Sequence, residues 1–310
     1  MTLLTRKRTL LAKIESSYGV DSTPTGAADA MLVQNMEITP LTVESQARDL
    51  IRTYIGNSQD IVGAFYGSIS FEVEVAGAGA AGTAPKYGPL LRACGLAEVI
   101  NASVSVVYTP VSTGFESVVQ YFNIDGVLHK LLGGRGTVSL KCANRQVPKF
   151  VFNLMGLFVT PTDTAAPTPD YSGYILPLAF NKANTPTFTL HGISGTVLRT
   201  LSIDLGNKVS YRNLVNSEAV LLTDRNAAGN IEIEATTIAT KNWWTAARDA
   251  STGAMQLVHG TVAGNIVQID APAVQITAPT YGDFEGGAMM NAGIKLNPSS
   301  GNDELTITIK

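Results

Sequence analysis

Alternation of apolar and polar residues is the feature that most restricts the fold of this chain. In residues 68–75, one Ile, one Phe and two Val alternate with Ser and Glu. Successive side chains of a strand point to opposite faces, so this pattern is typical of a sheet with one buried and one polar face. Similar segments recur at 103–108, 117–124, 137–142, 150–159, 187–190, 198–205, 231–235, 266–269 and 305–309. Short strands separated by Gly, Pro, Asn and Asp predict a mainly β fold of the sandwich or barrel type.

Helical pattern is scarce. We predict short helices at 87–94 and 241–248, and a third around Leu10, Leu11 and Ile14. On the second of these helices, Trp243 is expected to seat the helix on its sheet. Residues 133–136, Gly-Gly-Arg-Gly, are interpreted as a hairpin turn before the strand at 137–142.

The two halves of the chain echo each other. Residues 71–75 and 231–235 share one alternating pattern at an offset of 160, and Arg52 and Arg212 share the same offset. A predicted short helix follows each strand. Residues 160–169 are rich in Pro, Thr and Ala and show no periodicity, which is typical of a linker. We therefore predict two tandem β domains, residues 31–160 and 186–310, joined by a linker at 161–185, each with a short flanking helix.

Low charge restricts the surface. Hydrophobic residues make up 45% of the chain and charged residues only 15%, against about 25% charged in a typical soluble domain. We expect another subunit to cover part of the exterior; a large monomer with a Thr-, Ser- and Asn-rich surface is the alternative. The net charge of −3 gives no basic field for phosphates, so specific DNA binding is not expected.

Targeting and cysteine signals are few. The basic start of the chain lacks the apolar run of a signal peptide, and no segment is long and apolar enough to be expected to span a membrane. Cys94 and Cys142 are the only cysteines. Two cysteines do not make a disulfide framework, and Cys94, which lies in an apolar run, is expected to be a buried, reduced thiol of a protein made in a reducing cytoplasm.

Several motifs resemble chemical sites but are better explained structurally. Residues 77–82 read Gly-x-Gly-x-x-Gly, the fingerprint of a dinucleotide loop. The preceding strand carries Glu72 and Glu74, whereas a buried parallel strand would be apolar, and Pro85 interrupts the following helix. We interpret the segment as a connector and the glutamates as a polar sheet face rather than an acid/base pair. The three histidines are far apart. We therefore predict no catalytic residues, no cofactor and no metal.

Residues 15–95 resemble the tail tube (major tail) proteins of long, non-contractile bacteriophage tails. No single motif is diagnostic, and the resemblance depends on an ordered set. The residues that carry it are 15–25 (ESSYGVDSTPT), 30–35 (AMLVQN), 48–56, 69–74 (ISFEVE), 79–85 (GAAGTAP) and 90–95 (LLRACG). The rest of the chain is similar only in its β pattern, including the closing strand at 305–309.

The resemblance implies a structural subunit without enzymatic activity. Six β domains would form a ring, and rings would stack into a hollow tube through which DNA passes without specific binding. Residues 1–30 would be an N-terminal arm, and a long loop at 39–62 would bridge rings. The inter-subunit residues expected on that loop are Arg48, Asp49, Arg52 and Tyr54. Glu72 and Glu74 would face the lumen and repel phosphate.

The main partner implied is the chain itself. If the duplication is real, three chains would make a pseudo-sixfold ring; a hexamer with the second domain on the outside is the alternative. Further partners would be the tape measure, terminator and distal tail proteins. The protein would be assembled in the host cytoplasm and located in the virion tail. Two alternative functions remain: a tail hub or terminator ring protein, and a nucleotide-dependent enzyme that uses residues 77–82.

Overall fold

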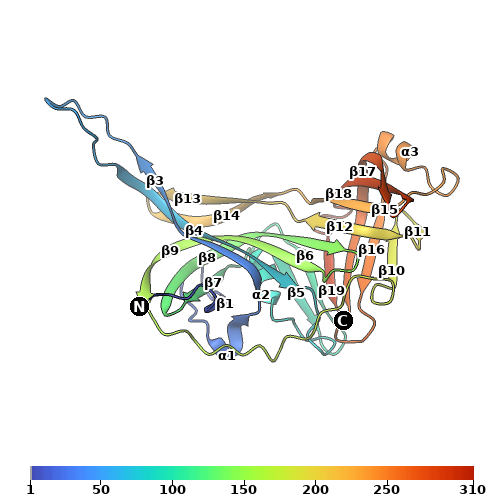
Figure 1. Cartoon of the computed structure of the whole chain (residues 1–310), viewed down its shortest axis with the longest axis horizontal. Coiled ribbons are helices and arrows are strands. Elements are labelled where there is room, and N and C mark those ends of the chain that lie inside the picture. The colour runs from blue at the N-terminus through green and yellow to red at the C-terminus, as the bar shows by residue number, and fades with distance from the viewer. Residues whose placement is uncertain (1) are drawn as a thin grey trace.

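The computed structural model describes residues 2–310, and strands dominate it (Figure 1). Over these residues, 17 strands belong to one hydrogen-bonded network and two form a separate hairpin. The predicted mainly β fold is confirmed.

The elements follow one another in two similar series. In the first half the strands are β1 (Arg8–Ile14), β2 (Ala30–Met31), β3 (Gln34–Gln46), β4 (Ile61–Glu74), β5 (Leu96–Asn101), β6 (Ser105–Pro110), β7 (Val118–Ile124), β8 (Val127–Ala143) and β9 (Lys149–Asp163). In the second half they are β10 (Thr187–Leu190), β11 (Ile193–Ser194), β12 (Leu198–Asp204), β13 (Asn207–Leu214), β14 (Ser217–Arg225), β15 (Ala228–Glu234), β16 (Thr252–His259), β17 (Val267–Phe284), β18 (Gly287–Asn297) and β19 (Thr306–Ile309). The helices are α1 (Gly26–Asp29), α2 (Gly88–Ala93) and α3 (Trp243–Arg248).

The two halves repeat one strand order. Hydrogen-bonded neighbours run β3–β4–β9–β8–β7–β1–β2 in the first half. They run β12–β15–β18–β17–β16–β10–β11 in the second. Helix α2 follows β4, and α3 follows β15 in the same place. The sequence offset of 160 therefore reflects a repeated topology; the β5–β6 hairpin has no counterpart among the described strands of the second half.

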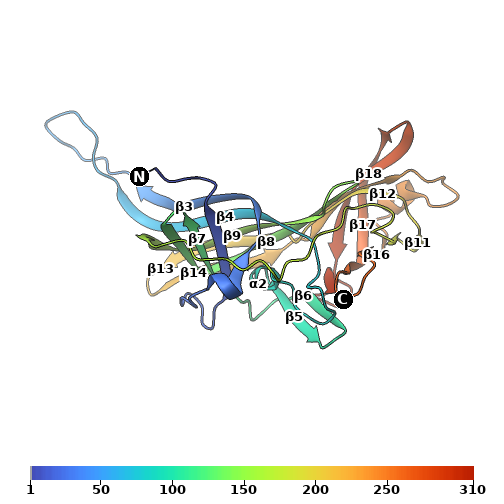
Figure 2. The ribbon, with the colours of Figure 1, turned by 60° about the horizontal axis from the view of Figure 1, so that its bottom comes forward.

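One continuous sheet runs through both halves. Strand β8 is long enough to pair with two strands along the same edge: residues 127–134 pair with β7, and residues 139–143 pair with β12. Eight strands thus lie side by side in the order β3–β4–β9–β8–β12–β15–β18–β17. We call this set the spanning sheet. It links the first half, at the left of Figure 2, to the second half at the right. Strand β19 joins the halves again by pairing with β6 and β17.

A single core lies beneath the spanning sheet. The rings of Phe71 and Phe152 stack there with centroids 5.6 Å apart, and both side chains are fully buried. The predicted helices at 87–94 and 241–248 are confirmed as α2 and α3. Trp243 is buried, as expected of the residue that seats α3, and the Tyr87 hydroxyl beside α2 donates to the Ala76 carbonyl at 2.7 Å.

The helix predicted around Leu10, Leu11 and Ile14 is wrong, because this segment is strand β1. Strand β1 pairs with β7 and β2, and three consecutive residues, Leu10 to Ala12, are buried. A strand covered on both faces shows a continuous apolar run, which periodicity cannot distinguish from a helix. From Arg8 onward, the segment expected to be an N-terminal arm is therefore built into the first half of the chain.

Two connections also differ from expectation. Residues 133–136 are not a hairpin turn but part of β8, which continues through an irregularity between Leu132 and Arg135. Beyond β9, which ends at Asp163, the linker packs against the first half. Its Asp170 amide donates to the Gly26 carbonyl at 2.9 Å. Farther along, Phe180 is buried, and its ring lies 5.9 Å from that of His259 in the second half.

Candidate functional site

The spanning sheet has one polar face, opposite the core. Odd-numbered positions of β4 such as Phe71 and Val73 are buried, so the even-numbered Glu72 and Glu74 point the other way. The same alternation continues in β8, β9, β12, β15 and β18. The acidic residues of this face are Glu37, Glu72, Glu74, Asp204, Glu232 and Glu234, and the basic ones are Arg135, Lys141, Lys149, Arg199 and Lys295. The Arg199 guanidinium is ion-paired with Glu232 at 2.6 Å. The face is therefore polar with a small excess of negative charge.

Glu72 is held by its neighbours. Its carboxylate accepts from Lys149 Nζ at 2.8 Å and from Asn35 Nδ2 at 2.9 Å. The hydrogen bond from Lys149 holds the pKa of Glu72 below its ordinary value. Glu74 accepts from Gln34 Nε2 at 2.6 Å. Glu72 and Glu74 thus lie on one face, each beside a partner on a neighbouring strand rather than paired with each other.

The long β3–β4 connection projects away from the body of the molecule (Figure 1). It carries Arg48, Asp49, Arg52 and Tyr54, all exposed, and the Arg52 guanidinium lies 5.6 Å from the centroid of the Tyr54 ring. The apolar side chains of Ile51 and Ile55 are also fully exposed. The structure brings the four predicted loop residues together on one exposed segment. Exposed apolar side chains on such a segment are typical of a contact surface.

The spanning sheet ends in two unpaired edges within residues 2–310. Strand β3 pairs with β4 alone. Strand β17 pairs with β16 only up to Gln275, so the edge on that side is open over the rest of the strand. Unpaired edges expose backbone donors and acceptors that another strand can bind. Residues 34–39 of β3 carry no Lys that would block such pairing.

The glycine-rich connector at 77–82 serves close backbone packing. The Gly77 amide donates to Asn265 Oδ1 at 2.9 Å, and the Gly79 amide donates to the Gly264 carbonyl at 3.0 Å. A Cβ on Gly77 would lie 2.0 Å from the Gly264 carbonyl oxygen, so only glycine fits there. The connector thus fastens the first half to the β16–β17 loop, and its amides are used by protein.

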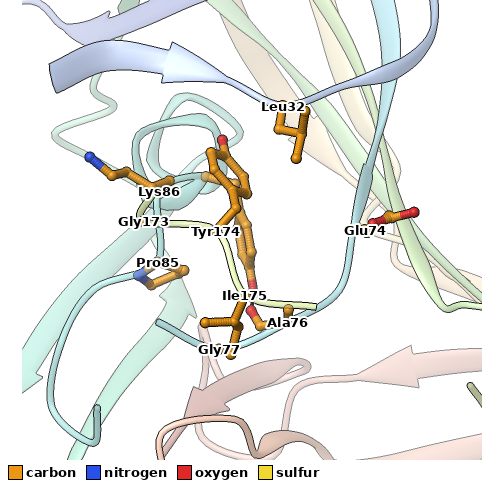
Figure 3. A pocket seen from close by; sticks show the side chains of 10 residues that line it. Leu32, Glu74, Ala76, Gly77, Pro85, Lys86, Gly173, Tyr174 and Ile175 are labelled. Carbon is orange, nitrogen blue, oxygen red and sulfur yellow. Dashed lines mark hydrogen bonds between the residues drawn. The ribbon is translucent and has the colours of Figure 1, made fainter. Parts of the chain in front are cut away.

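A small cavity next to this connector is shown in Figure 3. It measures about 20 Å³, and its lining includes Gly77, Pro85, Lys86, Tyr174 and Ile175. A volume of roughly 15 Å³ holds one water molecule. The cavity is therefore far too small for a dinucleotide.

Other candidates for chemistry do not converge over the described part of the chain. Residues 2–310 contain no group of three or more His, Cys, Asp or Glu side chains placed to hold a metal ion. Cys94 and Cys142 are free and buried, and burial raises the pKa of both thiols, to about 12 for Cys142. No helix within residues 2–310 is long and apolar enough to cross a membrane.

One buried polar cluster was not predicted, although its residues lie in the segment that carries the family resemblance. The Glu15 carboxylate accepts from the Gly19 amide at 2.8 Å, the Gly133 amide at 2.6 Å and the Ser117 hydroxyl at 2.5 Å. The hydroxyl of Tyr18 accepts from the amide of β14 residue Val220 at 2.5 Å. The ESSYG sequence therefore fixes β8 and the β13–β14 hairpin in place. Glu15 directly follows β1 and lies two residues from Lys13, so the sequence around it gave no signal that its carboxylate is buried.

Comparison with known proteins identifies the class. The sequence model of the phage tail tube protein family matches residues 5–306. The match covers nearly the whole chain, and the chain therefore belongs to this family of structural phage tail proteins. It is accordingly a component of the virion tail. No curated protein matches the sequence.

Proposed function

We propose that this protein assembles into rings of three chains, that the rings stack into the tail tube, and that DNA leaves the capsid through the lumen. The single observation that carries the proposal is the spanning sheet, which repeats one four-stranded unit twice per chain and leaves both ends unpaired. Such a head-to-tail surface produces a closed ring when the rotation between units closes.

Strand spacing supports a ring of this size. Three copies of the eight-stranded sheet would give a barrel of 24 strands. With strands about 4.8 Å apart and tilted by about 40°, the backbone diameter would be about 50 Å. This diameter leaves room for a DNA duplex even when the side chains of the wall are included. Six chains would double the diameter. The second half continues the sheet of the first, which favours three chains over six with an external second domain.

Charge on the polar face supports its assignment to the lumen. The face carries more carboxylates than ammonium groups, including Glu74 and Glu234. A negatively charged wall repels phosphate, so DNA can slide without binding. Glu72→Lys/Glu74→Lys should therefore slow DNA ejection from otherwise normal virions, and Asp163→Lys, at the exposed end of β9, is the control. Ejection at the wild-type rate in the double variant would contradict the lumen assignment.

The β3–β4 loop supplies the contact between rings. Its fully exposed Ile51 and Ile55, flanked by Arg48 and Arg52, need a partner surface. We propose that it reaches an adjacent ring. Deleting residues 48–55 should leave single rings that do not stack, and unchanged tubes would exclude this role.

Electron microscopy of the purified protein tests the function as a whole. Extended tubes of uniform width are the expected result. Single rings that never stack would favour a tail hub or terminator ring instead, and a protein that stays monomeric at high concentration and in the presence of other tail components would overturn the proposal.

A further inference from the structure

We propose that residues 35–39 of β3 in one chain pair antiparallel with residues 280–284 of β17 in the next chain of the ring. The register would be the one that β12 keeps with β8 inside a single chain. This inference rests on the proposed ring and specifies the surface that closes it. Its partner is a second copy of this chain.

The junction inside the chain supplies the template. Strand β12 is the outermost strand of the second four-stranded unit, and β8 is the last strand of the first. They pair antiparallel through Ser202 with Lys141, Ile203 with Leu140, and Asp204 with Ser139. If both units are repeats, the same junction is needed between β17 of one chain and β3 of the next.

The position of β3 follows from its pairing with β4. Ser202 of β12 lies opposite Asn230 of β15. At an offset of 160, Ser70 of β4 lies opposite Glu37 of β3. Ser202 and Glu37 are therefore equivalent, and the next two residues of each strand follow in step.

The position of β17 follows in the same way. In the first half, Glu74 lies opposite Lys149, which lies opposite Lys141. In the second half, the equivalent Glu234 lies opposite Met289, which lies opposite Gly282. Gly282 is therefore the counterpart of Lys141. Between chains, the pairs would be Glu37 with Gly282, Ile38 with Tyr281, and Thr39 with Thr280.

Burial supports this register. At the junction inside the chain, Leu140 and Ile203 face each other with only 5% and 1% of their surfaces exposed. Their counterparts are Tyr281, which is 67% exposed, and Ile38, which is half-buried. An apolar pair that is covered at one junction is thus uncovered at the other. Docking of the next chain would bury it.

Two prolines mark where the pairing ends. Pro40 follows Thr39 in β3, and Pro279 precedes Thr280 in β17. In the proposed register, the two prolines would lie opposite each other. Proline has no amide hydrogen, so two opposite prolines cannot exchange ladder hydrogen bonds. Neither of them leaves an amide donor that needs an acceptor. The pairing can therefore stop at this point without burying unpaired amides.

The hairpins give an independent argument. In the second half, the β13–β14 hairpin lies over β8 and β9 of the first half, and its Val220 is fully buried (Figure 1). The equivalent part of the β3–β4 hairpin has no such cover, and Leu41, Val43 and Phe65 are each more than 40% exposed. A neighbouring chain docked on β3 would place its own β17 and β18 beneath this hairpin.

Cysteine cross-linking tests the register. In Thr39→Cys/Thr280→Cys, the two Cβ atoms would lie about 5 Å apart between chains. Within one chain they are separated by seven strand spacings, about 34 Å along the sheet. Assembled tubes treated with a short bismaleimide and denatured should shift from the 32.7 kDa monomer to a covalent species of three times that mass. Cys94 and Cys142 are buried and contribute no background.

A matched variant distinguishes register from proximity. Thr39→Cys/Phe284→Cys keeps both thiols on the polar face but moves one by four residues, about 13 Å, and should stay monomeric. If the first variant fails to assemble, the two single variants, Thr39→Cys and Thr280→Cys, are mixed and assembled together. Because each chain then carries one new thiol, cross-linking should give dimers only. Regular tubes without cross-links, or equal cross-linking of the control, would overturn the register while leaving the tube function intact. Absence of tubes in the wild-type protein would overturn the function itself.

Discussion

Arg135 fastens the β13–β14 hairpin to the first half, and its removal should loosen that hairpin specifically. Its guanidinium donates to the carbonyls of Phe115 at 2.7 Å, Val220 at 3.0 Å and Glu116 at 3.1 Å. It also lies 4.6 Å from the centroid of the Tyr18 ring. Burial lowers the pKa of Arg135, so part of its hydration is already lost in the folded chain.

The magnitude follows from these contacts. A hydrogen bond to a charged donor contributes about 1.5–3 kcal/mol, and the half-buried position reduces the sum for three of them. Arg135→Met, which keeps much of the apolar stem, should lower the free energy of unfolding by about 2–4 kcal/mol. Arg135→Lys cannot reach three carbonyls and should also lower the free energy of unfolding. Because it keeps the charge, its loss should be smaller than that of Arg135→Met.

Urea unfolding and amide hydrogen exchange measure the effect. Exchange should rise in residues 217–225 of β14 and stay unchanged in the core strand β9. A loss of stability below about 1 kcal/mol, together with unaltered exchange in β14, would refute the role assigned to Arg135.

Three further changes test other parts of the structure. Gly77→Ala should destabilise the chain markedly, because its Cβ would overlap the Gly264 carbonyl. Dinucleotides should leave the melting temperature of the wild-type protein unchanged. A rise in melting temperature with a dinucleotide would support the enzyme alternative. The Glu72–Lys149 pair holds the pKa of Glu72 low, so its stabilisation is present above the ordinary carboxyl pKa and lost as pH falls through the lowered one. In Lys149→Met, the free energy of unfolding lost as pH falls should be smaller by about 1 kcal/mol or less. An identical pH dependence of stability in both proteins would argue against the pair. Tyr281→Asp should abolish assembly and lower monomer stability only slightly, since the side chain is 67% exposed and loses one ring contact, with Trp244 at 4.9 Å between centroids. Leu176→Asp, at an exposed linker residue, should assemble normally, and tubes from Tyr281→Asp would count against a role for β17.

Local patterns predicted much of the fold because they report one-sided burial. Alternation around Phe71 and Ile231 predicted β4 and β15, and the offset between them predicted the repeated topology. The same signal failed for β1, where both faces are covered and Leu10 to Ala12 are all buried. Gly133 was interpreted as part of a turn because glycine favours one, yet the tertiary pairing of β8 with β9 carries the strand through it.

The assembly surfaces depended on information that a local pattern does not contain. The family resemblance predicted a long loop at 39–62, of which residues 39–46 and 61–62 are strand in the structure, and alternation predicted the polar position of Glu72. The open edges of β3 and β17 could not be predicted, because an edge is defined by the absence of a long-range partner. Likewise, the pairing of β8 with β12 joins residues some 60 positions apart and depends on the whole architecture.

The symmetry of a single ring in cross-section tests the central claim most directly. A cryo-electron microscopy map of the assembled tube should show three chains per ring, with six similar β units and an unbroken inner wall of 24 strands in which β3 of each chain lies beside β17 of the next. Six chains per ring, or an inner wall interrupted between β17 and β3, would contradict the account.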